Sequence, residues 1–86
     1  MAEPRPPAWL LAAVPIASEA GLQYLREAGA RWRGRPSGLL PNEFLLVGAR
    51  CPGCGVSLVV ITDGDREAQE ITDALRAVGG CPHPAA

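Results

Sequence analysis

All three cysteines and the only histidine of this 86-residue chain fall into two short segments that together could bind a metal ion. Cys51 and Cys54 are separated by two residues, and Cys81 and His83 are separated by one. Three thiolates and one imidazole form a complete ligand set for a closed, structural zinc site. An odd number of cysteines fits poorly with a disulfide scaffold. The sequence therefore predicts one structural Zn²⁺ bound by these four residues.

The first of these segments reads Cys51-Pro52-Gly53-Cys54-Gly55 and resembles the knuckle of rubredoxins and zinc ribbons. In that turn the backbone N–H groups point at the sulfurs, and the glycine after the second cysteine permits a positive φ. The resemblance is confined to the turn and implies a structural metal between two strands. Those families present a second Cys-X-X-Cys knuckle, whereas this chain offers Cys81-X-His83. Because a rubredoxin-type iron site needs four thiolates, the histidine favours zinc.

The elements that must position the ligands follow from the spacing of apolar residues. A helix is predicted from about residue 18 to 32, with Ser18 as its N-cap. Strands are predicted at 43–49 and 56–62, so that the knuckle is the turn of a hairpin. A second helix follows, with Asp63 or Asp65 as its cap, and ends at Gly79 just before the last two ligands. The apolar run 9–14 allows a helical turn or an edge strand.

These elements predict an α+β fold in which a helix, a β-hairpin with the knuckle and a second helix are closed by Cys-X-His. A chain this short forms one domain at most and has a small core, so a metal cross-link has a clear physical use. Residues 9–86 are predicted to be that domain. Residues 1–8 are rich in proline and are predicted to be an extended arm.

Two features of the sequence indicate where the core lies. Residues 58–61 are apolar at every position, which indicates a strand buried on both faces. We expect a helix to cover one face, and the N-terminal segment or a partner chain to cover the other. The predicted buried stripes are Leu22, Leu25, Ala28, Gly29 and Trp32 on the first helix, and Ala68, Ile71, Leu75 and Val78 on the second.

The segment 26–35 is a second candidate site, because it holds several arginines around a tryptophan. Arg31, Arg33 and Arg35 are all expected to be exposed and could bind phosphates, while Trp32 could stack on a base. The interpretation that we favour is a solvated helix end with Trp32 in the core. A net charge of −1 also argues against a general nucleic-acid binder.

The predicted function is that of a non-catalytic zinc protein, an interaction module or accessory subunit of a larger complex. No enzyme is expected, because the only histidine belongs to the metal site. A protein partner or a homo-oligomer is expected, without membrane or small-molecule substrate. Nucleic-acid binding is the second hypothesis. Dithiol redox or metal transfer is the third, although a redox Cys-X-X-Cys opens a helix and this one precedes a strand.

The expected location is the cytoplasm. Paired thiols beside a histidine fit a reducing compartment and metal binding. The apolar run 8–17 is too short to span a bilayer and is interrupted by Pro15.

Overall fold

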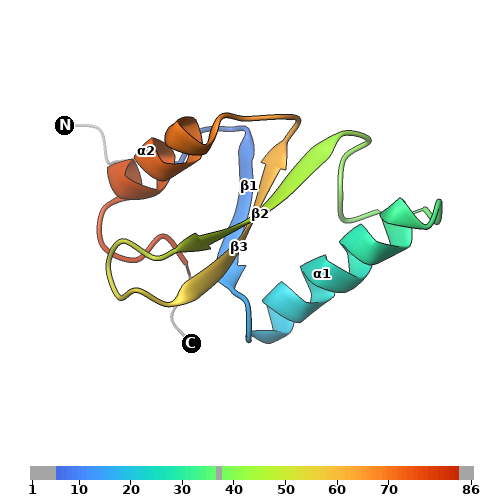
Figure 1. The fold of residues 1–86 in the computed structure, drawn as a ribbon, viewed down its shortest axis with the longest axis horizontal. Coiled ribbons are helices and arrows are strands. Elements are labelled where there is room, and N and C mark those ends of the chain that lie inside the picture. Colours follow the sequence, from blue (N-terminus) through green and yellow to red (C-terminus); the bar gives the residue numbers. More distant parts are fainter. Residues whose placement is uncertain (1–5, 37, 84–86) are drawn as a thin grey trace.

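The computed structural model describes residues 6–36 and 38–83, which form two helices and one three-stranded antiparallel sheet (Figure 1). The fold is therefore α+β. The strand order is β1-β3-β2, so the last strand of the chain lies at the centre of the sheet. The elements are, in chain order, β1 (Leu10–Pro15), α1 (Glu19–Trp32), β2 (Phe44–Arg50), β3 (Ser57–Asp63) and α2 (Ala68–Val78).

Strand β1 comes from the apolar run for which the sequence allows either a helical turn or an edge strand. It pairs antiparallel with β3, with Ala13 opposite Val60 and Val14 opposite Val59. On the other side of β3, Val47 of β2 is also opposite Val60. The predicted arrangement of helix, hairpin and helix lacks this third strand, because a short apolar run without clear periodicity does not define its own pairing partner.

The central strand β3 is buried on both faces, as its unbroken apolar run predicts. Residues 58–61 are each exposed by no more than 1%. Leu58 and Val60 belong to the core cluster that contains Ile71 of α2, whereas Val59 and Ile61 belong to the cluster that contains Ala28 of α1. The two helices thus cover opposite faces (Figure 1). Helix α2 covers the face for which the sequence suggests the N-terminal segment or a partner, and Trp9 and Leu10 of the N-terminal segment pack against the same core cluster.

Helix α1 begins as predicted, since the Ser18 hydroxyl accepts a hydrogen bond from the Gly21 N–H at 3.0 Å. Ala28 is fully buried, and Leu25 packs against the same cluster. Two other members of the predicted stripe are not buried, because Leu22 is 46% and Trp32 is 71% exposed. The last turns of α1 extend past the sheet (Figure 1), so a side chain there finds little core to enter.

Helix α2 begins later than the acidic residues suggest. Asp63 belongs to β3, where its N–H donates to the Trp9 carbonyl at 2.8 Å. The cap position is Glu67, whose side chain makes no capping hydrogen bond, so the expected aspartate cap is wrong. Ile71 and Leu75 are buried as predicted. Ala68, in the first turn, is exposed.

The predicted arm lies largely outside the described residues, which begin at Pro6. The Pro7 carbonyl accepts a hydrogen bond from the Leu10 N–H at 3.0 Å, which fixes the chain just before β1. Neither helix in the described part of the chain has the length and apolar character needed to cross a bilayer.

Candidate metal centre

The first two ligands lie in the turn between β2 and β3, where the sequence places the knuckle. The Cys51 N–H donates to the Val56 carbonyl at 2.9 Å, and the Gly55 N–H donates to the Cys51 carbonyl at 2.8 Å. Gly55 has a φ of 78°, a conformation that favours glycine. The Gly53 N–H donates to the Cys51 sulfur at 3.4 Å. The turn therefore has the N–H-to-sulfur geometry that its resemblance to a knuckle implies.

The other two ligands reach the knuckle because the chain reverses after α2. Gly79 and Gly80 have φ values of 78° and 56°, so two successive residues adopt a conformation that other side chains rarely tolerate. The reversed chain passes close to Gly53. A Cβ atom on Gly53 would lie 2.7 Å from the Gly80 carbonyl carbon and 2.9 Å from the Cys81 sulfur. The glycine inside the motif is thus required for the two segments to pack.

All four predicted metal ligands come together. The ligand atoms of Cys51, Cys54, Cys81 and His83 all lie within 4.8 Å of one another. The Cys54 Sγ and His83 Nε2 atoms are 3.4 Å apart. Ligand atoms at the corners of a zinc tetrahedron, with bonds of 2.0–2.3 Å, would be about 3.3–3.8 Å apart. The cluster needs only small side-chain adjustments to fit such an ion.

The centre lies at the surface, with one ligand anchored in the core. Cys51 is 3% exposed and belongs to the core cluster beneath α2. Cys54 and Cys81 are exposed, and His83 is half-buried. A metal ion here would connect the hairpin turn to the chain that follows α2, with solvent on its outer side.

The three thiols influence each other's protonation. Burial raises the pKa of Cys51, but backbone N–H groups of Cys54 and Gly53 lower it more, so the pKa is reduced overall. The pKa of Cys54 is lowered mainly by the Val56 N–H. The pKa of Cys81 is raised to about 11, because its thiol hydrogen-bonds to the sulfurs of the other two and would repel them if ionised. The lowered pKa values of Cys51 and Cys54 favour the thiolate form, which is the form that binds a divalent cation.

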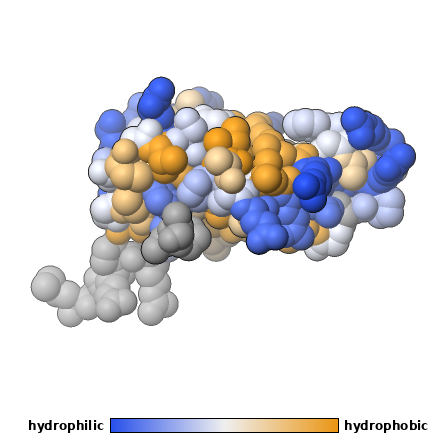
Figure 2. Space-filling model, turned by 90° about the horizontal axis from the view of Figure 1, so that it is seen from below, coloured by the Kyte–Doolittle hydropathy of each residue, from blue (hydrophilic) through white to orange (hydrophobic). Residues whose placement is uncertain are grey.

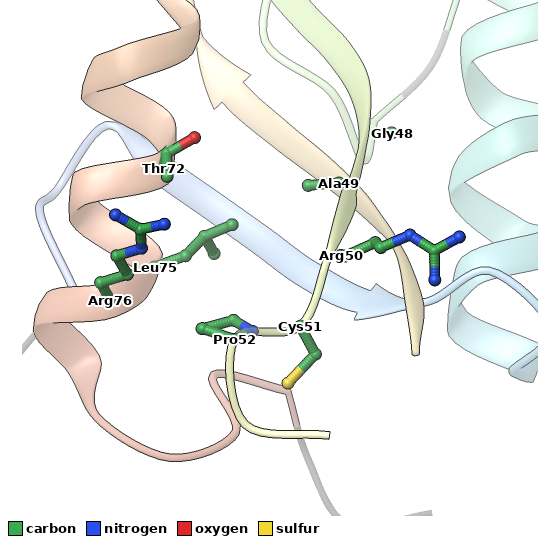
Figure 3. A pocket seen from close by; sticks show the side chains of 8 residues that line it. All are labelled: Gly48, Ala49, Arg50, Cys51, Pro52, Thr72, Leu75 and Arg76. Atoms are coloured by element: carbon green, nitrogen blue, oxygen red, sulfur yellow. The ribbon is translucent and has the colours of Figure 1, made fainter. Parts of the chain in front are cut away.

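An open cavity of about 400 Å³ adjoins the centre, between the end of β2 and the face of α2 (Figure 3). Leu75 and Ala49 contribute apolar side chains, and Arg76 lies at the rim (Figure 3). The side chain of Arg50 extends away from Arg76 (Figure 3), so the two charges do not converge on a common ligand position.

The second predicted site lies at the end of α1, far along the molecule from the knuckle (Figure 1). Trp32 is mostly exposed, so its favoured placement in the core is wrong. Arg33 and Arg35 are exposed as predicted. Arg31 is not, because its guanidinium donates to the Leu40 carbonyl at 3.1 Å and to the Asn42 carbonyl at 2.8 Å. Sequence spacing does not reveal this contact, since it joins a helix to an irregular loop.

No family model, curated protein or solved structure matches this chain. The function must therefore be argued from the site itself.

Proposed function

We propose that Cys51, Cys54, Cys81 and His83 bind one structural Zn²⁺, and that the protein is a non-catalytic interaction module stabilised by this ion. The observation that supports the metal most directly is the convergence of four ligand atoms within 4.8 Å from two separate segments. One pair of ligands flanks a tight hairpin turn, and the other follows a helix. Packing alone would give no reason to place every thiol of the chain beside its only imidazole.

The ligand chemistry favours zinc over iron. Thiolate and imidazole together suit Zn²⁺, whereas a rubredoxin-type iron site needs four thiolates. Four protein ligands fill a tetrahedral shell and leave no position for water or substrate. The ion would therefore act by holding the hairpin and the end of α2 together.

The surface of the module offers support for a macromolecular partner. Several large apolar side chains are more than 40% exposed, namely Leu11, Ile16, Leu22, Trp32 and Leu39. Single exposed apolar side chains are common on proteins. The support for a partner comes from finding five of them on one small domain. The apolar strand β3 gives no support for a partner, because the two helices cover its two faces. An accessory subunit that docks through α1 or the neighbouring loops remains the function we propose.

The redox alternative requires an accessible thiolate, rather than a metal ligand, from the same cysteines. A dithiol would use Cys51 and Cys54 without metal, and the attacking thiolate would have to be accessible. Cys51 is 3% exposed, so the exposed Cys54 would have to be the attacking thiolate, and its sulfur lies 3.4 Å from the imidazole of His83. The closed ligand set therefore supports a structural metal better than it supports redox chemistry.

Metal analysis of the purified protein tests the proposal. We expect one zinc per chain, and thiols that react with a disulfide reagent only after a strong chelator is added. Cys81→Ala should lose the zinc, whereas Ser57→Ala, an exposed small residue at the start of β3, should retain it. Folded, metal-free protein with a disulfide between Cys51 and Cys54 would overturn the proposal and favour the redox alternative.

A further inference from the structure

The end of α1 concentrates positive charge in a protein whose net charge is −1. Residues 28–42 contain three arginines and no acidic residue. Arg33 and Arg35 are exposed to solvent. Hydrophilic side chains gather at this end of the molecule, on the right in Figure 2. An anionic ligand would thus meet its most favourable potential here.

The backbone at this end is held in place, and the arginines outweigh the negative end of the helix dipole. The Arg33 N–H donates to the carbonyls of Gly29 and Ala30, and the Arg35 N–H donates to Ala30 at 2.8 Å. These bonds occupy carbonyls at the negative end of the helix. The remaining partial charge of a helix C-terminus, about half an elementary charge, is smaller than that of the arginines around it.

An aromatic pair provides a flat surface beside the arginines. The rings of Trp32 and Phe44 are stacked, with centroids 6.4 Å apart and an interplanar angle of 26°. The Arg31 guanidinium lies 5.8 Å from the Phe44 centroid and is itself held by its hydrogen bonds to the 40–42 loop. Trp32 is nevertheless 71% exposed. One part of the indole is held by protein, and the rest is open to a stacking partner.

Two hollows at this end of the molecule share one arginine. The first, of about 430 Å³, is lined by residues of α1 and of the turn after it, among them Arg26 and Arg33. The second, of about 390 Å³, lies against the loop after the helix and includes Asn42. Arg35 lines both. A chain of phosphates passing from one hollow to the other would therefore stay close to Arg35.

We propose that Trp32, Arg33 and Arg35 form a binding surface for single-stranded nucleic acid. Single strands present unstacked bases to an exposed indole and phosphates to guanidinium groups, and both features are present here. An acidic peptide would satisfy the arginines but would leave the open aromatic face without a matching flat group. The inference names the partner of the proposed module. It rests on the proposed function only for the stability of the fold, because it uses none of the metal ligands.

Fluorescence anisotropy of a labelled oligothymidylate of about ten nucleotides, titrated with zinc-loaded protein at several salt concentrations, tests this inference. Two phosphate contacts predict that log K falls with log salt with a slope of about −1.4 for a single strand. The double variant Arg33→Gln/Arg35→Gln should remove most of that slope. Trp32→Ala should weaken binding about tenfold, and Trp32→Phe should restore part of it. Arg76→Gln, an exposed arginine on α2, is the control and should bind as the wild type does.

Three results would overturn the inference. One is the absence of binding at low salt, and another is binding that the arginine and tryptophan variants leave unchanged. The third is tighter binding of an acidic peptide at the same residues, which would identify a protein partner. Zinc content and melting temperature are measured on each sample. Zinc-loaded protein that ignores the oligonucleotide contradicts this inference alone, whereas zinc-free protein that binds it contradicts the metal proposal alone.

Discussion

The Nε2 atom of His83 lies 3.4 Å from the Sγ atom of Cys54, although the two residues are 29 positions apart in the chain. The intervening chain contains β3 and α2, so this contact closes a loop around the central strand and the helix that covers it. Apart from this closure, α2 is held to the sheet chiefly by the packing of Ile71 and Leu75. A metal ion at the contact would act as a cross-link where the small core gives limited support.

Gly53→Ala should lower both the zinc affinity and the stability of the protein, because the added Cβ lies inside the knuckle. The added Cβ would meet the Gly80 carbonyl and the Cys81 sulfur at less than 3 Å, so the second ligand segment must move away. Overpacking of this kind costs about 1–3 kcal/mol of unfolding free energy. Urea denaturation of zinc-loaded protein and competition with a chromophoric chelator measure both effects.

Gly48→Ala is the matched control for that substitution. Gly48 lies in β2 with no positive φ, and a Cβ there would meet nothing within 4 Å. This variant should keep the zinc affinity of the wild type. Equal zinc affinity in both glycine variants would show that the close approach at Gly53 does not position the ligands.

Cys54→Ser should destabilise the protein. Because Cys54 is exposed, the substitution removes a metal ligand without removing a side chain from the core. Losing a structural zinc commonly unfolds small domains, so we expect a loss of about 3 kcal/mol or more. Thermal denaturation followed by circular dichroism measures it, and a chelator should have the same effect on the wild type. A variant with the wild-type melting temperature would show that the site is dispensable for folding.

Zinc affinity should rise with pH around neutrality. The Cys81 thiol has a pKa of about 11 in the metal-free site, so it is protonated at neutral pH and must release its proton when it binds metal. Each proton released strengthens binding about tenfold per pH unit. Competition with a chelator of known pH dependence, at pH values between 6 and 8, gives the slope. Affinity that does not change with pH would contradict the participation of Cys81.

Arg31→Gln should destabilise the protein, whereas Arg33→Gln should not. Arg31 donates to two loop carbonyls, and its removal leaves the Leu40 carbonyl without that partner, at a cost of about 1–3 kcal/mol. Arg33 is exposed, and such surface changes usually stay within about 0.5 kcal/mol. Denaturation midpoints compare the two variants. Equal stabilities would show that the hydrogen bonds from Arg31 to the loop do not stabilise the protein.

The sequence predicts the four ligand residues because their types and their close spacing within each pair are local features. The knuckle has a recognisable spacing, and the glycine pair after α2 signals the turn that brings Cys81 back. The sequence also predicts that β3 is buried on both faces, since residues 58–61 are apolar at every position. In each case the signal lies within a few neighbouring residues.

Long-range contacts explain what the sequence does not predict. Strand β1 is defined by its pairing with β3, and the role of Arg31 depends on a loop whose path has no periodic signal. Trp32 lies at a stripe position of α1, but it stacks on Phe44 at the start of β2 and stays 71% exposed. Helical spacing gives the direction of a side chain and not whether core lies in that direction.

X-ray absorption at the zinc edge of the purified protein identifies the ligands of the ion. We expect a four-coordinate ion with three sulfur ligands at about 2.3 Å and one nitrogen at about 2.0 Å. The nitrogen contribution should disappear in His83→Ala. Zinc with four sulfur ligands, zinc with mainly oxygen ligands, or a wild-type spectrum in His83→Ala would contradict the centre described here.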